Sequence, residues 1–456
     1  MSKERLWELI EQRKKEFEDI SDAVWDFAEL RFQEHKSSKL QREFMEKEGF
    51  RITCPVAGMD TAFIAETGSG KPVFAILGEN DALPQQSQVA NICEQRPIEE
   101  GTSGHACGHN LLGTGGMEAA CALKTYMEEN HIPGTLRYYA CPGEEGGGGK
   151  VFMARAGVFD DVDIAQSWHP SCDTTMDNTM LACVSFYVRF HGIAAHAAGE
   201  PWNGRSALDA AELMNIGINY LREHMLPTSR IHYAFTNAGG TAPNVVQPFC
   251  ELSYCVRATD GDYMEELYNR VIDCAKGAAL MTGCTLEEPY IYSAFKDYLW
   301  NDTLDELTLK NLEILLPQIS YTEEELAYAE KLKKCGTAPD AETPIDLTIN
   351  YDRRKPPRGS SDVADASYCM PLTQARVVSA TIGSVGHGWT TTVVGKNGIA
   401  HKGMHTAAKC IASCFYDMWE DPSIIEKAKA DHQKMLHGRT YKTMVPPERK
   451  PGDGFQ

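Results

Sequence analysis

The sequence predicts an α/β protein in which a mixed, mostly parallel sheet forms a larger domain and a smaller α+β, ferredoxin-like domain is inserted into it. Over the first 180 residues, short strand-like runs alternate with helical patterns, which is typical of parallel sheets with crossover helices. From residue 181 the order changes to β-α-β-β-α, and after residue 297 helices resume. We therefore expect a first part over 1–180, an inserted domain over 181–297, and a second part of the larger domain over 298–456.

In the first part, residues 3–50 carry apolar side chains at helical spacing and predict two helices. Strand-like runs follow at 61–67 and 72–81, and the second breaks into a loop at "ALPQQSQ". A helix is expected over 111–131, directly after the motif "GTSGHACGHNLLG". The strand "GTLRYYACP", the turn "GEEGGGGK" and the strand-like run "VDIAQSWHP" then continue the α/β pattern.

The inserted domain begins with the strand "MLACVSFYVRFHG", followed by a helix over 206–224. Two further strands, "IHYAFTNAG" and "FCELSYCVRAT", precede the helix "GDYMEELYNRVIDCAKGAALMTG". In the last part, the loop "DRRKPPRGSSD" precedes the final strands and a helix over 400–419.

The bulk composition is that of an ordinary globular protein. The chain has 456 residues, 43% of them hydrophobic, and a formal net charge of −20, which argues against nucleic acid and anionic membranes as partners. Its fifteen cysteines are scattered without a CxxC pair, so we expect a reducing, cytoplasmic environment. The first twenty residues resemble a charged amphipathic helix rather than a signal peptide, and no apolar run is long enough to span a bilayer.

The stretch "GTSGHACGHNLLG" places His105, Cys107 and His109 within five positions. Thiolate sulfur and imidazole nitrogen both bind Zn²⁺ and related metals well. The same residues could instead form a cysteine nucleophile with a histidine base, or a glycine-rich turn without chemistry. The motif alone leaves the three interpretations open.

Carboxylates that could complete a metal site occur in "PGEEGGGG", where Glu144 and Glu145 follow a strand. Adjacent side chains in an extended segment point in opposite directions, so one acid could hold a metal while the other faces a bound water. Taken alone, such a pair is more often a solvated acidic turn. Asp81 ends the strand that starts near residue 72 and could orient a ligand histidine, although a turn aspartate is the simpler interpretation.

Four further candidates are ambiguous when each is taken alone. His169 and His387 are isolated histidines, which are more often structural than ligands. In the inserted domain, Asn244 fits a simple turn, and Arg257 is either a surface charge or a fork for a substrate carboxylate. His196, also in the inserted domain, could reach the other groups only by domain closure or across a dimer.

Taken together, these motifs resemble the co-catalytic metal amidohydrolases, a family that includes aminoacylase, plant auxin-amino-acid hydrolases and bacterial glutamate carboxypeptidase. The segments "DALP", "HACGHN", "GEEG", "SWHP", "AAHA", "APNVV" and a distal "GH" occur in the family's order over nearly the whole chain. The resemblance implies an α/β catalytic domain with an inserted lid and dimerisation domain. It also implies two divalent metal ions, Mn²⁺ or Zn²⁺, bound by five residues: Cys107, His109, Glu145, His169 and His387.

Roles for the other candidates also follow from the resemblance. Glu144 would be the general base, and Asp81 would support a ligand histidine. His196 and Asn244 would reach a neighbouring subunit's active site and help hold the oxyanion. Arg257 lies where glutamate-cleaving relatives keep an arginine for the substrate carboxylate.

The sequence departs from the family pattern at two positions. Glu79 stands where many relatives have a metal-binding histidine, and we do not assign it to the metal. Asn110 stands where the auxin-conjugate hydrolases have an acid beside the ligand histidine, which leaves the metal identity open. His105 is interpreted as a supporting or structural residue.

The expected activity is metal-dependent hydrolysis of the amide bond in an N-acyl amino acid, such as aminobenzoyl-glutamate, or in a dipeptide. We expect a homodimer, possibly with a related subunit, and no nucleic-acid or membrane partner. Two alternatives are a non-catalytic metal-binding partner subunit and an amidase with Cys107 as nucleophile. The cysteine alternative leaves Glu144, Glu145, His169 and His387 without a role.

Overall fold

The computed structural model describes residues 2–176, 179–354, 356–357 and 359–453. Two compact units make up the chain. Unit 1 comprises Met1–Thr179, Leu299–Pro356 and Ser361–Tyr441, and unit 2 comprises Met180–Tyr298, Pro357–Ser360 and Lys442–Gln456.

Unit 1 is built on an eight-stranded mixed sheet with the strand order β1-β2-β4-β3-β5-β13-β6-β12. The strands are β1 (Arg51–Thr53), β2 (Phe63–Ser69), β3 (Val73–Gly78), β4 (Gly134–Ala140), β5 (Ile164–Ser171), β6 (Thr174–Thr175), β12 (Ile349–Asn350) and β13 (Leu372–Val378). The neighbours β4, β3, β5 and β13 run parallel, whereas β1, β2 and β6 introduce antiparallel pairs. The carboxyl ends of four parallel strands therefore meet at one edge of the sheet.

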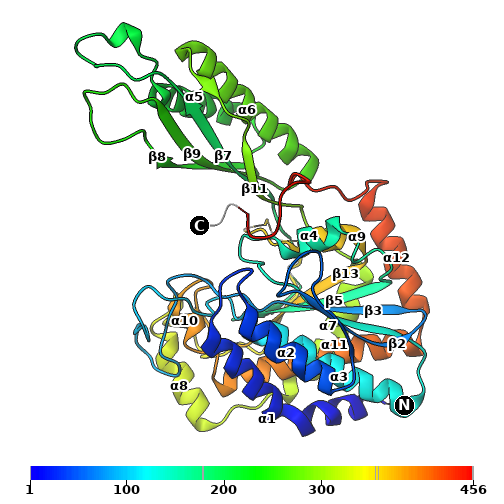
Figure 1. The fold of residues 1–456 in the computed structure, drawn as a ribbon. Helices are drawn as coiled ribbons and strands as arrows, with labels where there is room; N and C mark the ends of the chain where they lie inside the picture. The colour runs from blue at the N-terminus through cyan, green and yellow to red at the C-terminus, as the bar shows by residue number, and fades with distance from the viewer. Residues whose placement is uncertain (1, 177–178, 355, 358, 454–456) are drawn as a thin grey trace. The chain divides into compact units, whose positions relative to one another are not determined.

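Helices cover both faces of this sheet (Figure 1). They are α1 (Lys3–Phe27), α2 (His35–Lys47), α3 (His109–Asn130), α4 (Gly149–Arg155), α7 (Asp302–Leu315), α8 (Glu323–Lys333), α9 (Val363–Cys369), α10 (Trp389–Thr392), α11 (Gly398–Glu420) and α12 (Ser423–Leu436). Helices α3 and α11 pack against the central strands, and α1 packs against both of them. Helices α4 and α9 contact each other on the opposite face. The predicted mixed α/β architecture is confirmed.

The core of unit 1 lies between the sheet and helices α1, α3 and α11. The apolar positions that predict α1, among them Leu6, Phe17 and Val24, are buried. Phe74 of β3 stacks on Phe415 of α11 with ring centroids 4.5 Å apart, an arrangement that fixes the helix on the sheet.

Unit 2 contains an antiparallel sheet with the strand order β10-β7-β9-β8, with β11 also paired to β7. Its elements are β7 (Ala182–His191), α5 (Ala207–Leu221), β8 (Arg230–Asn237), β9 (Phe249–Ala258), α6 (Gly261–Thr282), β10 (Thr285–Leu286) and β11 (Tyr290–Phe295). Alternate residues of β9 are buried beneath α5 and α6, as a sheet covered on one face requires. Short 3₁₀ turns occur at Pro201–Asn203, Arg222–His224 and, in unit 1, Leu316–Gln318.

Two details differ from the sequence expectation. Strand β3 ends at Gly78, three residues before Asp81, so Asp81 lies in the connecting loop. Helix α12 was not expected, because its apolar positions are few and its exposed face is charged. No described helix is both long and apolar enough to cross a bilayer.

Candidate metal centre

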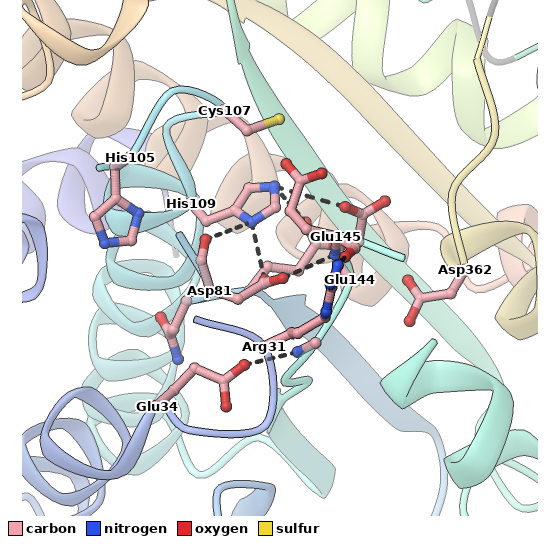
Figure 2. A network of polar contacts seen from close by, with 12 residues as sticks. Arg31, Glu34, Asp81, His105, Cys107, His109, Glu144, Glu145 and Asp362 are labelled. Atoms are coloured by element: carbon pink, nitrogen blue, oxygen red, sulfur yellow. Dashed lines mark hydrogen bonds and ion pairs between the residues drawn. The ribbon is translucent and has the colours of Figure 1, made fainter. Parts of the chain in front are cut away.

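The chemical side chains of unit 1 gather where the parallel strands end. Asp81 follows β3, Glu144 and Glu145 follow β4, and His387 lies beyond β13, while His169 belongs to the last part of β5. In open α/β sheets, ligands bind at this carboxyl edge because the connecting loops converge there. Figure 2 shows these loops with Cys107 and His109 facing the two glutamates.

Cys107 and His109 lie on either side of a tight turn at the start of α3. Gly108 has a left-handed backbone (φ 77°), and a Cβ atom there would approach the ring of Pro170 to 3.0 Å. Glycine is therefore required by both conformation and space. The turn places the cysteine and the first helical residue on the same side, toward β5 and the β4 loop.

The donor atoms form three overlapping groups whose members lie within 4.8 Å of one another. The groups are Cys107, His109 and His169; Cys107, Glu145 and His387; and Glu79, His109 and Glu144. Cys107 belongs to the first two, and Sγ of Cys107 lies 3.4 Å from Nε2 of His169. The five predicted ligand residues are thus brought together around Cys107, and their mixed S, N and O donors suit a transition metal.

Both central histidines are oriented by bonds from their Nδ1 atoms. Nδ1 of His109 lies 3.0 Å from Oδ1 of Asp81, and Nδ1 of His169 lies 2.7 Å from the carbonyl oxygen of Pro170. An Nδ1–H donor leaves Nε2 free to act as a ligand. Nε2 of His109 is buried and makes no hydrogen bond to any described residue, which fits an atom intended for a metal ion.

Asp81 is fully buried and holds two elements of the site at once. Its Oδ2 accepts a hydrogen bond from the backbone N–H of Glu145 at 2.8 Å, while Oδ1 faces His109. Burial alone would raise the pKa of Asp81, but the charge and hydrogen bond of His109 outweigh it and lower the pKa. The carboxylate therefore stays ionised and keeps His109 in one orientation.

Glu144 and Glu145 lie in a turn rather than in the extended segment that the sequence predicts. Arg31 donates a hydrogen bond to the carbonyl oxygen of Glu145 at 2.6 Å, which together with Asp81 fixes the turn. The two carboxylates still have separate surroundings. Glu145 faces His387, with Oε1 3.3 Å from Nε2, whereas Oε2 of Glu144 lies 4.0 Å from Nε2 of His109.

Electrostatics distinguish the two glutamates from ordinary surface acids. Burial, followed by repulsion from Glu145 and Glu79, raises the pKa of Glu144 well above its usual value. Burial and the nearby Cys107 also raise the pKa of Glu145. A crowded set of buried acids is costly without a compensating cation. The arrangement therefore favours metal binding, and Glu144 has the raised pKa expected of a proton acceptor.

Two residues of the opening motif have structural contacts. Nε2 of His105 lies 3.1 Å from the carbonyl oxygen of Val24, and its ring points away from the glutamates (Figure 2). The amide nitrogen of Asn110 donates to the hydroxyl of Ser21 and to the carbonyl of Gly395, at 3.0 and 3.1 Å. Asn110 thus connects α3 to α1 and to the loop before α11.

Sequence reasoning missed a buried ion network behind the site. Nζ of Lys150 lies 2.5 Å from Glu79 and 2.7 Å from Asp362, and the side chains of all three residues are almost completely buried. The other carboxylate oxygen of Glu79 lies 3.3 Å from Nε2 of His109. The unusual glutamate at position 79 is thus matched by a lysine, and the "GGGGK" sequence after the two glutamates was the available signal.

The predicted residues of the inserted domain belong to unit 2. His196 and Asn244 come from neighbouring backbone segments, because Ala197 N–H donates to the carbonyl of Asn244 at 3.0 Å. Both side chains are exposed, and Nδ1 of His196 accepts from the amides of Ala198 and Gly199. Arg257 lies on β9 and donates to the hydroxyl of Ser360 at 3.2 Å.

An α/β sheet whose carboxyl edge gathers thiol, imidazole and carboxylate donors, with a further carboxylate at their margin, defines a metallohydrolase-type site. The model of peptidase family M20/M25/M40 matches residues 75–447. The chain belongs to this family, and it is an enzyme that hydrolyses linear amide bonds.

Two relatives with known activities share most of their length with this chain. It is 39% identical to one of the two kinds of p-aminobenzoyl-glutamate hydrolase subunit in Escherichia coli, covering 96% of both chains. It is 32% identical to the Xaa-Arg dipeptidase of Mus musculus, covering 81% of this chain and 78% of the dipeptidase. The family predicted from the motifs, and its aminobenzoyl-glutamate branch, are confirmed.

Solved structures establish the same fold at lower identity. An aminobenzoyl-glutamate utilization protein from Klebsiella pneumoniae superposes with a TM-score of 0.63 at 18% identity, covering 91% of this chain and 99% of that one. A dinuclear metal-binding peptidase from Bacillus subtilis gives a TM-score of 0.55 at 20% identity, covering 88% and 99%.

Proposed function

We propose that this enzyme hydrolyses the amide bond of an N-acyl amino acid, with aminobenzoyl-glutamate as the leading candidate, and that it uses two divalent metal ions. The observation that carries the proposal is the pair of donor groups that share Cys107, with Glu144 beside them. The similarity to an aminobenzoyl-glutamate hydrolase and to a dipeptidase supports this substrate class.

The residues proposed to hold the two ions are Cys107, His109, Glu145, His169 and His387. Bound divalent ions supply Lewis-acid chemistry, which lowers the pKa of water toward ~7 and polarises a carbonyl oxygen. Either Mn²⁺ or Zn²⁺ suits this donor set, since imidazole and thiolate favour zinc while the carboxylates also accept manganese.

Glu144 is the proposed general base. Its raised pKa suits a group that takes a proton from the attacking water and returns it to the leaving amine. Asp81 keeps Nε2 of His109 directed at the centre during this exchange. The turn that carries Glu144 is fixed by Arg31 and by the Asp81 carboxylate, so the base is positioned in advance.

The residues of unit 2 have proposed roles in substrate binding. His196 and Asn244 are assigned to the oxyanion of the tetrahedral intermediate in a neighbouring subunit, where removal of one donor typically costs roughly 100–1000-fold in rate. Arg257 is assigned to the carboxylate of the substrate's amino-acid part, because a guanidinium matches a carboxylate in a bidentate geometry. Unit 2 would then act as a ferredoxin-like lid and dimerisation domain, with predicted limits 181–297.

The proposed assembly is a homodimer formed through unit 2, although a related subunit is a second possibility. Strand β8 is at the edge of its sheet and pairs only with β9 within the described chain. Ile216 and Tyr220 on α5 are 52% and 76% exposed, which is unusual for large apolar side chains. An unpaired strand edge with apolar neighbours is suited to a second copy of the same surface.

We also propose a cytoplasmic location, as the cysteine usage suggests. All fifteen cysteines are free thiols, including Cys410 and Cys414, which lie one helical turn apart. Such usage fits a reducing compartment.

The deciding experiment measures hydrolysis by the purified chain of aminobenzoyl-glutamate, indole-acetyl-aspartate and β-alanyl dipeptides, with Mn²⁺ and with Zn²⁺. We expect activity on at least one acyl amino acid, loss on chelation, and recovery when metal is returned. Activity that survives chelation but is abolished by thiol alkylation would support the alternative in which Cys107 is a nucleophile. Stoichiometric metal without any amidase activity would support the non-catalytic role.

A further inference from the structure

Two cysteines of unit 2 have their sulfur atoms in contact. Sγ of Cys183 lies 3.3 Å from Sγ of Cys255, and both residues are free thiols. They occupy the adjacent antiparallel strands β7 and β9, whose register pairs Cys183 with Arg257 and Ser185 with Cys255. The cysteines are therefore diagonal neighbours on the same face of the sheet, where side chains of adjacent strands can meet.

The surroundings of this thiol pair are cationic. Arg257 is two residues from Cys255 on β9, so both side chains emerge on the same face. On β8, the register places Arg230 beside Arg257 and His232 beside Cys255. Positive groups near a cysteine favour the thiolate, which is the nucleophilic form. The hydrogen bond from Cys183 and the charge of Arg257 both lower the pKa of Cys255, against the effect of burial.

The two thiols differ in accessibility. Cys255 is half-buried, whereas Cys183 is only 6% exposed. A reagent from solvent can therefore reach Cys255 before Cys183. The reachable sulfur is also the one beside Arg257, so accessibility and activation coincide on one residue, while its neighbour is held in contact behind it.

We propose that Cys183 and Cys255 form an oxidisable dithiol, which a peroxide converts into a cross-strand disulfide and a thiol reductant restores. The Cys255 thiolate attacks one peroxide oxygen, breaks the O–O bond and becomes a sulfenic acid, and the other oxygen leaves as water after protonation. The Cys183 thiol then attacks the sulfenic sulfur, loses its proton and releases a second water. Two thiols thus lose two electrons and two protons, and the peroxide gains them.

The distance requires little rearrangement. A disulfide has sulfurs about 2.05 Å apart, so the pair must close by roughly 1.3 Å, which rotation of the two side chains can provide. The backbone ladder between β7 and β9 is continuous from Ala182 to His191, so the strands already hold the cysteines side by side.

The consequence for catalysis rests on the proposed function of Arg257. In the reduced protein the Cys255 thiolate shares the positive charge of this guanidinium. Oxidation removes the thiolate and leaves the arginine free to attract a substrate carboxylate more strongly. We expect the KM for an acyl amino acid to fall by roughly two- to five-fold on oxidation, with kcat unchanged.

The test treats the reduced full-length protein with a few equivalents of hydrogen peroxide, blocks the remaining thiols, and maps the peptides by mass spectrometry without reduction. We expect a cross-linked pair of peptides that contains Cys183 and Cys255 and that disappears after dithiothreitol. In Cys183→Ser, dimedone should trap a sulfenic acid on Cys255. The matched control Cys274→Ser, which alters a half-buried cysteine on α6, should retain the cross-link.

Recovery of both cysteines as blocked free thiols, or of over-oxidised Cys255 without a cross-link in the wild type, would overturn the proposal. The kinetic part has its own readout, because a cross-link without a change in KM contradicts only the assignment of Arg257. Failure to hydrolyse any acyl amino acid would contradict the proposed function and would leave the peptide map as the decision on the dithiol.

Discussion

At the scale of single residues, the neighbouring glutamates 144 and 145 illustrate how environment separates identical side chains. Oε1 of Glu145 faces His387, and this glutamate shares a donor group with Cys107. Glu144 instead lies between Glu79 and His109, where repulsion and burial raise its pKa. The same chemical group is thus suited to holding a metal in one position and to moving a proton in the other.

Glu144→Gln keeps the shape of the side chain but removes its ability to accept a proton. We expect kcat to fall by roughly 100–10,000-fold while the bound metal per chain is unchanged, because general-base catalysis accounts for factors of this size. The measurement is steady-state hydrolysis together with elemental analysis of the dialysed protein. Glu145→Gln is the matched control and should lower the metal content. Wild-type turnover in Glu144→Gln would refute the assignment.

The opening motif allows a second comparison between residues two positions apart. Cys107 belongs to two donor groups, whereas burial, followed by the charge of His109, lowers the pKa of His105 to about 4 and leaves it neutral. Cys107→Ala should therefore lose bound metal, while His105→Ala should keep it and unfold at a lower temperature. Elemental analysis and thermal unfolding distinguish the two variants. Equal metal loss in both would mean that His105 also takes part in the centre.

At the scale of secondary-structure elements, charged side chains join helices to the loops around the site. Lys150, at the start of α4, contacts Glu79 after β3 and Asp362 before α9. Its backbone N–H also donates to Asp362 at 2.8 Å. A lysine with no exposed surface persists only when carboxylates compensate its charge.

Lys150→Met should destabilise the protein by about 3–5 kcal/mol, since two buried carboxylates lose their cation. Urea unfolding followed by tryptophan fluorescence measures the change in the free energy of unfolding. Lys124→Met, which alters a lysine that pairs with Glu128 near the surface of α3, is the control and should cost less than about 1 kcal/mol. Equal effects of the two substitutions would contradict the interpretation of Lys150.

A buried histidine connects α11 to α3 and α1. Nδ1 of His405 lies 2.9 Å from the carboxylate of Glu118, and Nε2 lies 3.4 Å from Glu18. Burial alone would lower the pKa of His405, but the two glutamates raise it from 6.5 to about 9. The folded state therefore binds this proton more tightly than the unfolded chain does.

The raised pKa predicts how stability depends on pH. The contribution of His405 is complete below pH 6.5 and is lost as the pH rises through about 9, with a total of about 3 kcal/mol. The unfolding free energy of the wild type minus that of His405→Gln should therefore shrink between pH 6.5 and 9. Denaturant titrations at intervals across this range provide the measurement. A difference that is constant with pH would show that the histidine is not charged in the folded protein.

At the scale of the whole molecule, unit 2 carries the features proposed for assembly. The edge strand β8 has mostly exposed side chains, and Tyr233 and Phe235 on it are 40% and 41% exposed. With Ile216 and Tyr220 on α5, they provide an apolar surface next to an unpaired strand edge. This combination is what a symmetric contact between two copies requires.

The double substitution Ile216→Glu and Tyr220→Glu should shift the protein from dimer to monomer in sedimentation velocity, because charges on both copies would be buried at the contact. Lost activity on acyl amino acids should accompany dissociation if His196 and Asn244 act across subunits. Leu280→Glu, at an 85% exposed position on α6, is the matched control for an added charge. A wild-type chain that sediments as a monomer at micromolar concentration would refute the homodimer.

The sequence by itself determined the fold class and the members of the site. Parallel strands place their carboxyl ends at a common edge, so the chemical residues after β3, β4 and β13 and in β5 could be assigned to one place from their order along the chain. The Cys-x-His turn and the adjacent glutamates were sufficient to predict metal chemistry. The limits of the inserted domain and the roles of His196, Asn244 and Arg257 stay predictions.

Only the tertiary structure decided which charges are buried together. Lys150 is 71 positions from Glu79 and 212 from Asp362, and Cys183 is 72 from Cys255, so no local pattern relates them. It also showed that Glu144 and Glu145 lie in a turn held by Arg31 and Asp81, not in an extended segment. Periodicity and motif order report the backbone path, whereas pairing energies depend on the packing of distant segments and on the water that packing excludes.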